Sequence, residues 1–419
     1  MKLKFGNPWL IFSPFLVVFT LLVLKLHADK MEGDESRYIM YAQNLLQGFY
    51  SPKNFVFLWN GPGYPLFLVP FLYFKLPLIT IPLANALMQY MSIVFLFKSI
   101  KAYAHTKVAF IASLAWGLYY LGYQEIPSIL TEPFTSFLMS SLLFTLTSFY
   151  TQGNKNYLYV SGVIIGLIVL TKFIFGYILF FMLIFWAAVF LFYRIKNIAK
   201  PKVKSLLIAL GIAFTMVTPY LAYTYNLTGR VFYWGNSGGM NLYWMSTPYE
   251  NEFGDWFPET LFNGQEVGGP TLYKNHLSDF TYFLTLKGVE SDDAYKKKGI
   301  ENIKKYPLKY LRNWLTNQGR LWFNFPQTGF SHTERGLLRF VPNAILLTFF
   351  ILSFYLWGLN FRKCPLEINF LALFILAYLA LSSLISALPR QLTISVPILL
   401  FWISYIQFRS TKVKISFEN

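Results

Sequence analysis

The stretch FIFGYILFFMLIFWAAVFLFY, from Phe173 to Tyr193, contains no charged residue and is apolar almost throughout. As a helix, these 21 residues would extend about 30 Å, the thickness of the hydrocarbon core of a bilayer. The whole chain has the same character, because 55% of its 419 residues are hydrophobic and only 13% are charged. This composition excludes a soluble domain and predicts an integral membrane protein.

Nine further apolar runs lie on both sides of this stretch, so we expect about ten transmembrane helices. The predicted spans are residues 8–26, 78–97, 108–121, 134–150, 157–170, 173–193, 205–223, 338–358, 369–385 and 392–408. The first follows Lys2 and Lys4 without the small-residue cleavage pattern of a signal peptide, so we interpret it as a retained helix. The predicted fold class is an all-α polytopic membrane protein.

Lysine and arginine outnumber acidic residues by 36 to 19, which gives a formal net charge of +17. With alternating spans, the basic clusters at 98–107, 194–204, 362–363 and 409–414 fall on one side of the membrane. Because Lys and Arg favour the cytoplasmic side, we predict a cell-membrane protein with both termini cytoplasmic. Part of the basic excess also suits a phosphate-bearing ligand, and no nucleic-acid partner is expected.

Residues 61–76 form another apolar run, but counting it as a crossing would invert every later loop. Its opening residues Gly61-Pro62-Gly63-Tyr64-Pro65 also break regular helix, so we predict a re-entrant or interfacial segment. The chain then divides into an N-terminal transmembrane region (1–223), a long extracytoplasmic loop (224–335) and C-terminal transmembrane helices (336–419). The first external loop is 27–60, and the long loop is large enough to form a small folded lid.

Acidic residues are scarce, yet Glu32-Gly33-Asp34-Glu35-Ser36-Arg37-Tyr38 concentrates them just beyond the outer end of the first span. Apolar residues then recur at helical spacing as far as Gly48, which predicts a short amphipathic helix along the membrane surface. A carboxylate there can accept the proton of an acceptor hydroxyl or amine as it attacks a sugar carbon. The alternative is that Asp34 only caps the helix.

The sequence from Gly33 to Tyr38, followed by Ala42, Asn44, Leu45, Leu46 and Gly48, resembles the first external loop of GT-C glycosyltransferases. The resemblance is to the family 39-like group, which includes protein O-mannosyltransferases and the aminoarabinose transferase of lipid A. It implies a GT-C-like bundle with interfacial helices in the first external loop, and a polyprenyl-phosphate sugar as donor.

Further stretches are similar to motifs of that group in the same order along the chain. They are Gly61-Pro62-Gly63-Tyr64-Pro65-Leu66, Thr131-Glu132-Pro133, Leu170-Thr171-Lys172, Gly238-Gly239-Met240-Asn241-Leu242-Tyr243, and Pro389-Arg390 with Pro397. Two positions depart from the pattern. Gln391 stands where an aromatic residue is usual, and Gly61-Pro62-Gly63 lacks the usual histidine.

The resemblance implies roles for three acidic residues. Asp34 would be the catalytic base that activates the acceptor, and Glu35 would share a metal or orient the site. Glu132 would be the second acidic group of the cavity, with a charge that merely favours the start of a helix as the alternative.

Basic residues on the predicted outer side are the candidates for donor binding. Lys172 and Arg390 would bind the phosphate of the donor, or alternatively extend to lipid headgroups. Arg37, Lys53 and Tyr64 complete the candidate substrate-binding residues of this side. For Arg37 and Lys53, the alternative is that they are ordinary surface charges.

The implied activity is transfer of a sugar, with inversion, from a polyprenyl-phosphate carrier to a lipid, glycan or protein acceptor on the extracytoplasmic face. A flippase or transporter of lipid-linked sugars is the competing class, but its functional charges would lie near the bilayer midplane. The single cysteine, Cys364, excludes an intramolecular disulfide and a cysteine-based zinc site. No cofactor is certain, and a divalent metal held by acids with His276 and His332 stays open.

Overall fold

The computed structural model describes residues 6–28, 31, 33–196, 202–259, 270–328 and 336–410. All regular structure within these ranges is helical, which confirms the predicted all-α class. Each of the ten predicted spans overlaps at least one helix. The helices of the membrane bundle are α1 (Pro8–Ile11), α2 (Ser13–Leu26), α5 (Thr80–Lys101), α6 (Thr106–Leu118), α8 (Thr131–Gln152), α9 (Lys155–Thr171), α10 (Ile174–Ile195), α11 (Val203–Thr228), α16 (Gly336–Asn360), α17 (Leu366–Ser383) and α19 (Val396–Ser410).

Five of the described helical segments are long and apolar enough to cross a membrane, and they correspond to α5, α10, α11, α17 and α16 with the following turn η2 (Phe361–Lys363). Helices α2, α6, α9 and α19 are apolar but shorter. The first predicted span is divided at Phe12, because Pro14 in the first turn of α2 has no N–H with which to continue α1. The apolar runs of the sequence therefore predicted the positions of the spans but did not predict this break.

Helix α8 differs from the other spans because nine of its 22 residues are Ser or Thr. Several of these hydroxyls bond to carbonyls one turn earlier, as Thr135 does to Thr131 at 2.7 Å. Others reach neighbouring helices: Thr145 Oγ1 lies 2.8 Å from Ser161 Oγ of α9. Small hydroxyl-bearing residues let helices pack closely and satisfy their own polar groups in an apolar medium. Their polarity is thus compatible with the largely buried position of α8.

The segment between the first two predicted spans contains two helices, α3 (Asp34–Leu46) and α4 (Gly63–Tyr73). Helix α4 has only 11 residues, so it extends about 16 Å, roughly half the thickness of the hydrocarbon core. It is too short to cross a membrane by itself, in agreement with the prediction for 61–76.

Four helices after α11 form a lid, defined here as residues 229–259 and 270–328. They are α12 (Gly238–Met245), α13 (Pro270–Phe283), α14 (Gly288–Lys305) and α15 (Pro307–Phe323). The lid has its own apolar cluster, separate from the core of the bundle, composed of Met240, Tyr243, Trp244, Phe257, Leu272, Phe280, Phe283 and Tyr295. Tyr243 and Trp244, from the Gly-Gly-x-Asn-Leu-Tyr motif and the residue after it, are therefore core residues of the lid.

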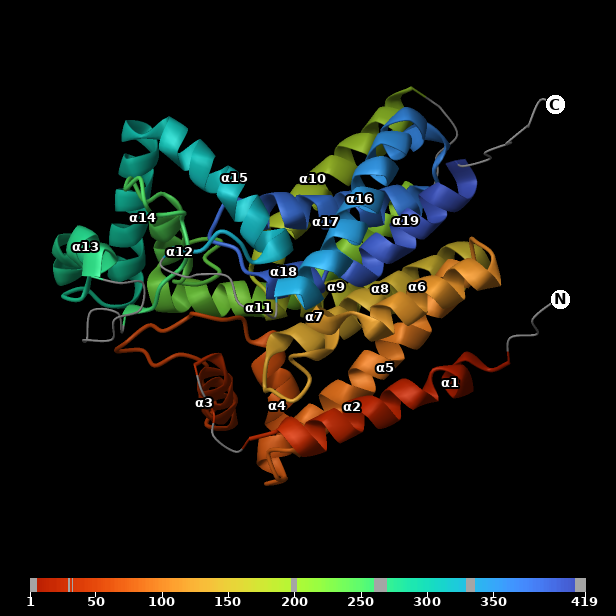
Figure 1. The fold of residues 1–419 in the computed structure, drawn as a ribbon, viewed down its shortest axis with the longest axis horizontal. Coiled ribbons are helices and arrows are strands. Elements are labelled where there is room, and N and C mark those ends of the chain that lie inside the picture. The colour runs from red at the N-terminus through yellow and green to blue at the C-terminus, as the bar shows by residue number, and fades with distance from the viewer. Residues whose placement is uncertain are drawn as a thin grey trace.

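Figure 1 shows the long helices of the bundle side by side, with α12, α13 and α14 of the lid gathered at one end. The start of α1 and the end of α19 lie at the opposite end, as do the connection between α5 and α6 and the C-terminal end of α10. The basic residues in the last turns of α5, α10 and α19, which are Lys98, Lys101, Arg194 and Arg409, therefore share one end of the bundle. That this end is cytoplasmic remains a prediction from the distribution of Lys and Arg.

Candidate active site

Helix α3 begins at Asp34, directly after Gly33, which has φ +55°. Only glycine adopts such a conformation without strain, and the turn places Asp34 and Glu35 together in the first turn of the helix. The positive end of the helix macrodipole favours negative charge there. The predicted amphipathic helix is thus present, with a buried face made of Tyr38, Ile39, Tyr41 and Ala42.

Asp34 lies between two guanidinium groups. Its Oδ1 accepts a hydrogen bond of 2.9 Å from Nη2 of Arg37, one turn further along α3. Its Oδ2 accepts another of 2.9 Å from Nη2 of Arg390, in the short helix α18 (Pro389–Thr393). The first external loop and a late segment of the chain are therefore joined through this one carboxylate.

Glu132 forms a second ion pair beside the first. It lies in the first turn of α8 with only 3% of its surface exposed, and its Oε1 accepts a hydrogen bond of 3.0 Å from Nζ of Lys172, the residue that ends α9. Nε of Arg390 lies 3.9 Å from the same oxygen. Arg390 therefore connects the two pairs into an ion-pair cluster of Asp34, Arg37, Glu132, Lys172 and Arg390.

Two sequence motifs, Gly61-Pro62-Gly63 and Leu170-Thr171-Lys172, are in contact beside the cluster. A Cβ atom at Gly61 would lie 2.0 Å from the carbonyl oxygen of Leu170, and one at Gly63 would lie 2.5 Å from Oγ1 of Thr171. Only glycine at both positions allows this approach of the Gly-Pro-Gly turn to the end of α9. The contact fixes the turn directly beside Lys172.

The cluster contains three cations and two carboxylates, and the carboxylate of Glu125 also interacts with Arg390. Burial works to lower the pKa of Arg390, but the neighbouring carboxylates of Glu132 and Asp34 raise the pKa above its ordinary value. Burial, together with the same two carboxylates, raises the pKa of the Tyr38 hydroxyl. Arg390 therefore stays charged and Tyr38 stays neutral at physiological pH.

Glu35 has a different environment from Asp34. Its Oε1 accepts a hydrogen bond of 2.8 Å from the backbone N–H of Ile129, in the segment that leads into α8. This contact ties α3 to the start of the helix that carries Glu132. The two roles given for Glu35, sharing a metal and orienting the site, remain predictions.

A metal held by acids and histidines was left open by the sequence, and the described residues bear on it. Within them, no group of three or more His, Cys, Asp and Glu side chains comes together in a way that could hold a metal ion. His276 lies inside the lid, where its Nε2 is 2.8 Å from Oε2 of Glu252, whereas His332 lies outside the described residues.

The remaining candidate residues lie in different places. Arg37 belongs to the cluster, and Tyr64 is completely buried beside it, with its ring edge-to-face against Tyr38 at 5.1 Å. Lys53 is exposed on the first loop, and no contact between it and the cluster is present in the described structure. A substrate-binding role for each of these residues remains a proposal.

Three residues near the cluster were not predicted from the sequence. Asn60 Oδ1 accepts a hydrogen bond of 3.4 Å from Arg37, and the Arg37 guanidinium lies 5.4 Å from the ring centroid of Trp59. Burial and the carboxylate of Glu132 raise the pKa of Glu125, which also interacts with Arg390. The position of Trp59-Asn60 directly before the Gly-Pro-Gly turn was the available signal for the first two.

No known family profile and no curated protein sequence matches the chain. Among solved structures, an oligosaccharyltransferase of Archaeoglobus fulgidus, tethered to an acceptor peptide, aligns with a TM-score of 0.50 and 13% identity, over 94% of this chain and 49% of that one. The chain has the fold of GT-C membrane enzymes. It spans about half the length of that oligosaccharyltransferase.

A second GT-C structure aligns over more of its own length but less closely. ArnT from Cupriavidus metallidurans, bound to undecaprenyl phosphate, gives a TM-score of 0.40 at 13% identity, over 94% of this chain and 77% of that one. A shared fold does not by itself establish a shared reaction. The chemistry must therefore be argued from the ion-pair cluster.

Proposed function

We propose that this chain is a membrane glycosyltransferase that moves a sugar from a polyprenyl-phosphate donor to an acceptor hydroxyl or amine. The observation that carries the proposal is the carboxylate of Asp34, held between Arg37 and Arg390 and next to the Glu132–Lys172 pair. A transferase of this kind needs a base for the acceptor and cations for the departing phosphate. The cluster supplies both within one network of contacts.

The cations of the cluster are suited to an anionic ligand because they are only partly buried. The side chains of Arg390 and Lys172 keep 33% and 20% of their surface exposed. An arginine can grip two phosphate oxygens, and a lysine adds a point charge. When the phosphate of the donor takes Arg390 and Lys172 as partners, one oxygen of Asp34 becomes available to the acceptor.

The proposed reaction is a single displacement. The acceptor oxygen or nitrogen forms a bond to the anomeric carbon while the bond from that carbon to the phosphate oxygen breaks. The electron pair leaves with the polyprenyl phosphate, whose charge Arg390 and Lys172 stabilise, and the acceptor proton passes to Asp34. Attack from the face opposite the leaving phosphate inverts the anomeric configuration.

The proposal includes the surroundings of the enzyme. The cluster would face the extracytoplasmic side of a cell membrane, with both termini cytoplasmic, since the basic last turns of α5, α10 and α19 lie at the other end of the bundle. The acceptor would be a lipid, glycan or protein presented from that side. Asp34 and Glu132 lie in the first turns of their helices, which suits chemistry at the mouth of the bundle better than the midplane site of a transporter.

The test is a turnover assay with purified protein in nanodiscs. A panel of synthetic polyprenyl-phosphate sugars is supplied with and without candidate acceptors, and release of free polyprenyl phosphate is measured. We expect release with one donor from wild type and none from Asp34→Asn, and NMR of the product should show an inverted anomeric centre.

Two outcomes would overturn the proposal. Equal turnover by wild type and a correctly folded Asp34→Asn variant would remove Asp34 as the base. Saturable binding of a lipid-linked sugar without release from any donor, together with movement of that lipid between leaflets of a vesicle, would identify a flippase instead.

A further inference from the structure

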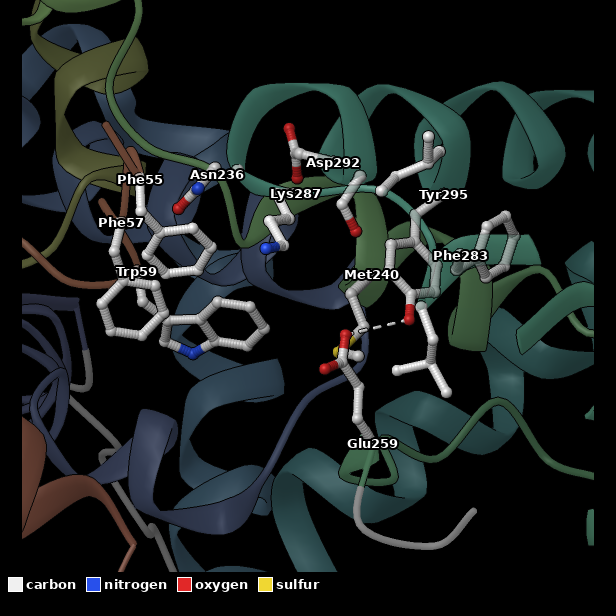
Figure 2. Close-up of a pocket in the computed structure, with 14 residues that line it drawn as sticks. Phe55, Phe57, Trp59, Asn236, Met240, Glu259, Phe283, Lys287, Asp292 and Tyr295 are labelled. Atoms are coloured by element: carbon white, nitrogen blue, oxygen red, sulfur yellow. Dashed lines mark hydrogen bonds between the residues drawn. The ribbon is translucent and has the colours of Figure 1, made fainter. Parts of the chain in front are cut away.

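A cavity of ≈ 240 Å³ lies between the first external loop and the lid, and no member of the ion-pair cluster lines it. Figure 2 shows the rings of Phe55, Phe57 and Trp59 on one side and those of Phe283 and Tyr295 on the other. Pockets for drug-sized ligands measure roughly 300–1,000 Å³. The volume therefore suits a single small ring rather than a long chain.

The first wall is a ladder of aromatic rings from alternate residues of one extended stretch. Phe55 stacks on Phe57 with centroids 6.1 Å apart, and Phe57 stacks on Trp59 with centroids 6.2 Å apart. The side chain of Asn236 holds this stretch against the lid, because it accepts a hydrogen bond from the N–H of Leu58 and donates one to the carbonyl of Val56. The ladder is therefore fixed in place before any ligand binds.

The lid also contacts this stretch at a glycine of the opposite wall. Gly288 has φ +58°, and a Cβ at this position would lie 2.8 Å from the carbonyl oxygen of Val56. A side chain there would separate the two walls. The positive φ and the close approach both require glycine, so the width of the cavity is built into the backbone.

Polar groups occupy the space between the aromatic walls. Tyr295 donates a hydrogen bond of 3.1 Å to Glu259, and Asp292 accepts one of 2.7 Å from the N–H of Gly239 through Oδ1. Lys287 lines the same space, and Figure 2 shows its side chain between the two walls. The cavity thus combines flat apolar faces with two carboxylates, a hydroxyl and an amine.

We propose that this cavity binds one sugar ring of the acceptor. The C–H face of a sugar ring carries partial positive charge and packs on the negative face of an aromatic ring, while its hydroxyls need the acceptors and donors that Glu259, Asp292 and Lys287 provide. A lipid chain would offer these polar groups no further hydrogen bond. A phosphate would meet two carboxylates against one lysine.

The cavity adjoins the proposed active site through one side chain. Trp59 lines the cavity, and its ring lies 5.4 Å from the guanidinium of Arg37, which pairs with Asp34. A sugar that packs on Trp59 would therefore lie against a residue that contacts Arg37, the ion-pair partner of the proposed base Asp34. The assignment of this sugar to the acceptor rests on the proposed function, whereas the binding of a sugar does not.

Binding is tested directly, without any donor. Saturation-transfer NMR on the full chain in nanodiscs, with methyl glycosides of glucose, mannose, galactose and N-acetylglucosamine as probes, reports which ring protons contact the protein. We expect one glycoside to bind through one ring face. Phe55→Ala should weaken that binding roughly two- to tenfold, the usual range for loss of one aromatic contact.

A matched control separates the cavity from general effects on the lid. Phe55 is 43% exposed and Tyr306, between α14 and α15 and outside the cavity, is 40% exposed, so Tyr306→Ala should leave binding unchanged. Asp292→Asn, which keeps the shape of the side chain, should also weaken binding. Glucose 6-phosphate should bind more weakly than methyl glucoside.

The outcomes distinguish this proposal from the proposed function. Absence of binding by every glycoside, or equal binding by wild type and Phe55→Ala, overturns the sugar site even if the turnover assay succeeds. Glycoside binding that is lost in Phe55→Ala and retained in Tyr306→Ala supports the site even if no donor is turned over.

Discussion

The ion-pair cluster around Asp34 and the polar network inside the lid both bring acids and bases together, but they differ in exposure. In the lid, the side chains of His276 and Glu252 are only 1% and 5% exposed. In the cluster, the side chains of Asp34 and Arg390 are 23% and 33% exposed. Water and ligands therefore have access to one set of charges and almost none to the other.

The two regions also differ in how completely their polar groups are paired. Glu252 of the lid accepts hydrogen bonds from Thr247 and Asn275 and contacts the His276 ring, whose other nitrogen lies 2.6 Å from the Tyr243 hydroxyl. A buried network satisfied in this way rigidifies the structure. Each ion pair of the cluster instead has at least one partly exposed member, which a ligand can reach. Paired charge that is fully buried indicates a scaffold, and paired charge that is partly exposed indicates a binding site.

The largest expected effect separates the two regions through the same chemical change, carboxylate to amide. Asp34→Asn keeps the shape of the side chain but removes the base, so kcat should fall by roughly 10²–10⁴-fold. Binding of the donor, measured separately by titration with a lipid-linked sugar, should be retained. If this variant turned over at the wild-type rate, the cluster would be a structural scaffold like the buried network of the lid.

The next effect concerns the cation that joins the two ion pairs. Arg390→Gln removes the charged partner of both Asp34 and Glu132, so the loss of kcat/KM should be roughly 10- to 100-fold, as for loss of a charge-assisted hydrogen bond to phosphate. Arg312→Gln is the control, because Arg312 is an exposed arginine of the lid whose pairing with Glu250, at 3.5 Å, is on the surface. Equal loss in both variants would contradict a specific role for Arg390.

Much of the fold was predictable from sequence because hydropathy reports burial in a bilayer directly. The ten predicted spans all fall on helices, and the predicted short helix after the first span is α3. The break at Phe12 was missed, because a single helix turn is too short to change a hydropathy pattern. The assembly of the lid was not predictable either, since its aromatic core comes from segments with no common periodicity.

The candidate site was predictable residue by residue but not as a set of contacts. Asp34, Glu132, Lys172 and Arg390 each lie in a motif of a different segment, and the structure brings them together. No pattern in one sequence pairs Asp34 with a residue 356 positions away. Asn60 and Trp59 were missed because a neutral amide and one more aromatic residue, in a chain that is 20% aromatic, carry no signal of their own.

The counterpart of Asp34→Asn in the lid is Glu252→Gln. This change replaces the buried carboxylate that Thr247, Asn275 and the His276 ring contact with a neutral amide. The free energy of unfolding should therefore fall by about 1–3 kcal/mol, the usual cost of disrupting buried hydrogen bonds to a carboxylate. Turnover per folded molecule should stay within about twofold of wild type. Thermal unfolding and active-site titration on the same sample measure the two quantities. Unchanged stability of Glu252→Gln with lost turnover would mean that the lid network serves catalysis and is not a scaffold.

The smallest effect concerns Asp292, one of the two acids of the lid that line the cavity. Burial raises the pKa of Asp292 from 3.8 to about 6, with Asp293 adding to the increase and the Gly239 N–H, Lys296 and Arg230 opposing it. In the unfolded chain the group ionises near its ordinary pKa, so the folded state binds the proton more tightly between these two values. The contribution of Asp292 to the free energy of unfolding is thus fully present below pH 4 and falls as the pH rises towards 6, by at most about 3 kcal/mol.

The measurement compares wild type with Asp292→Asn, which removes the ionisable group. The difference in melting temperature between the two proteins should change from pH 4 to pH 7 and stay constant at higher pH. Parallel curves over the whole range would mean that Asp292 has nearly the same pKa in the folded lid as in the unfolded chain, and that its environment resembles the exposed cluster more than the buried network.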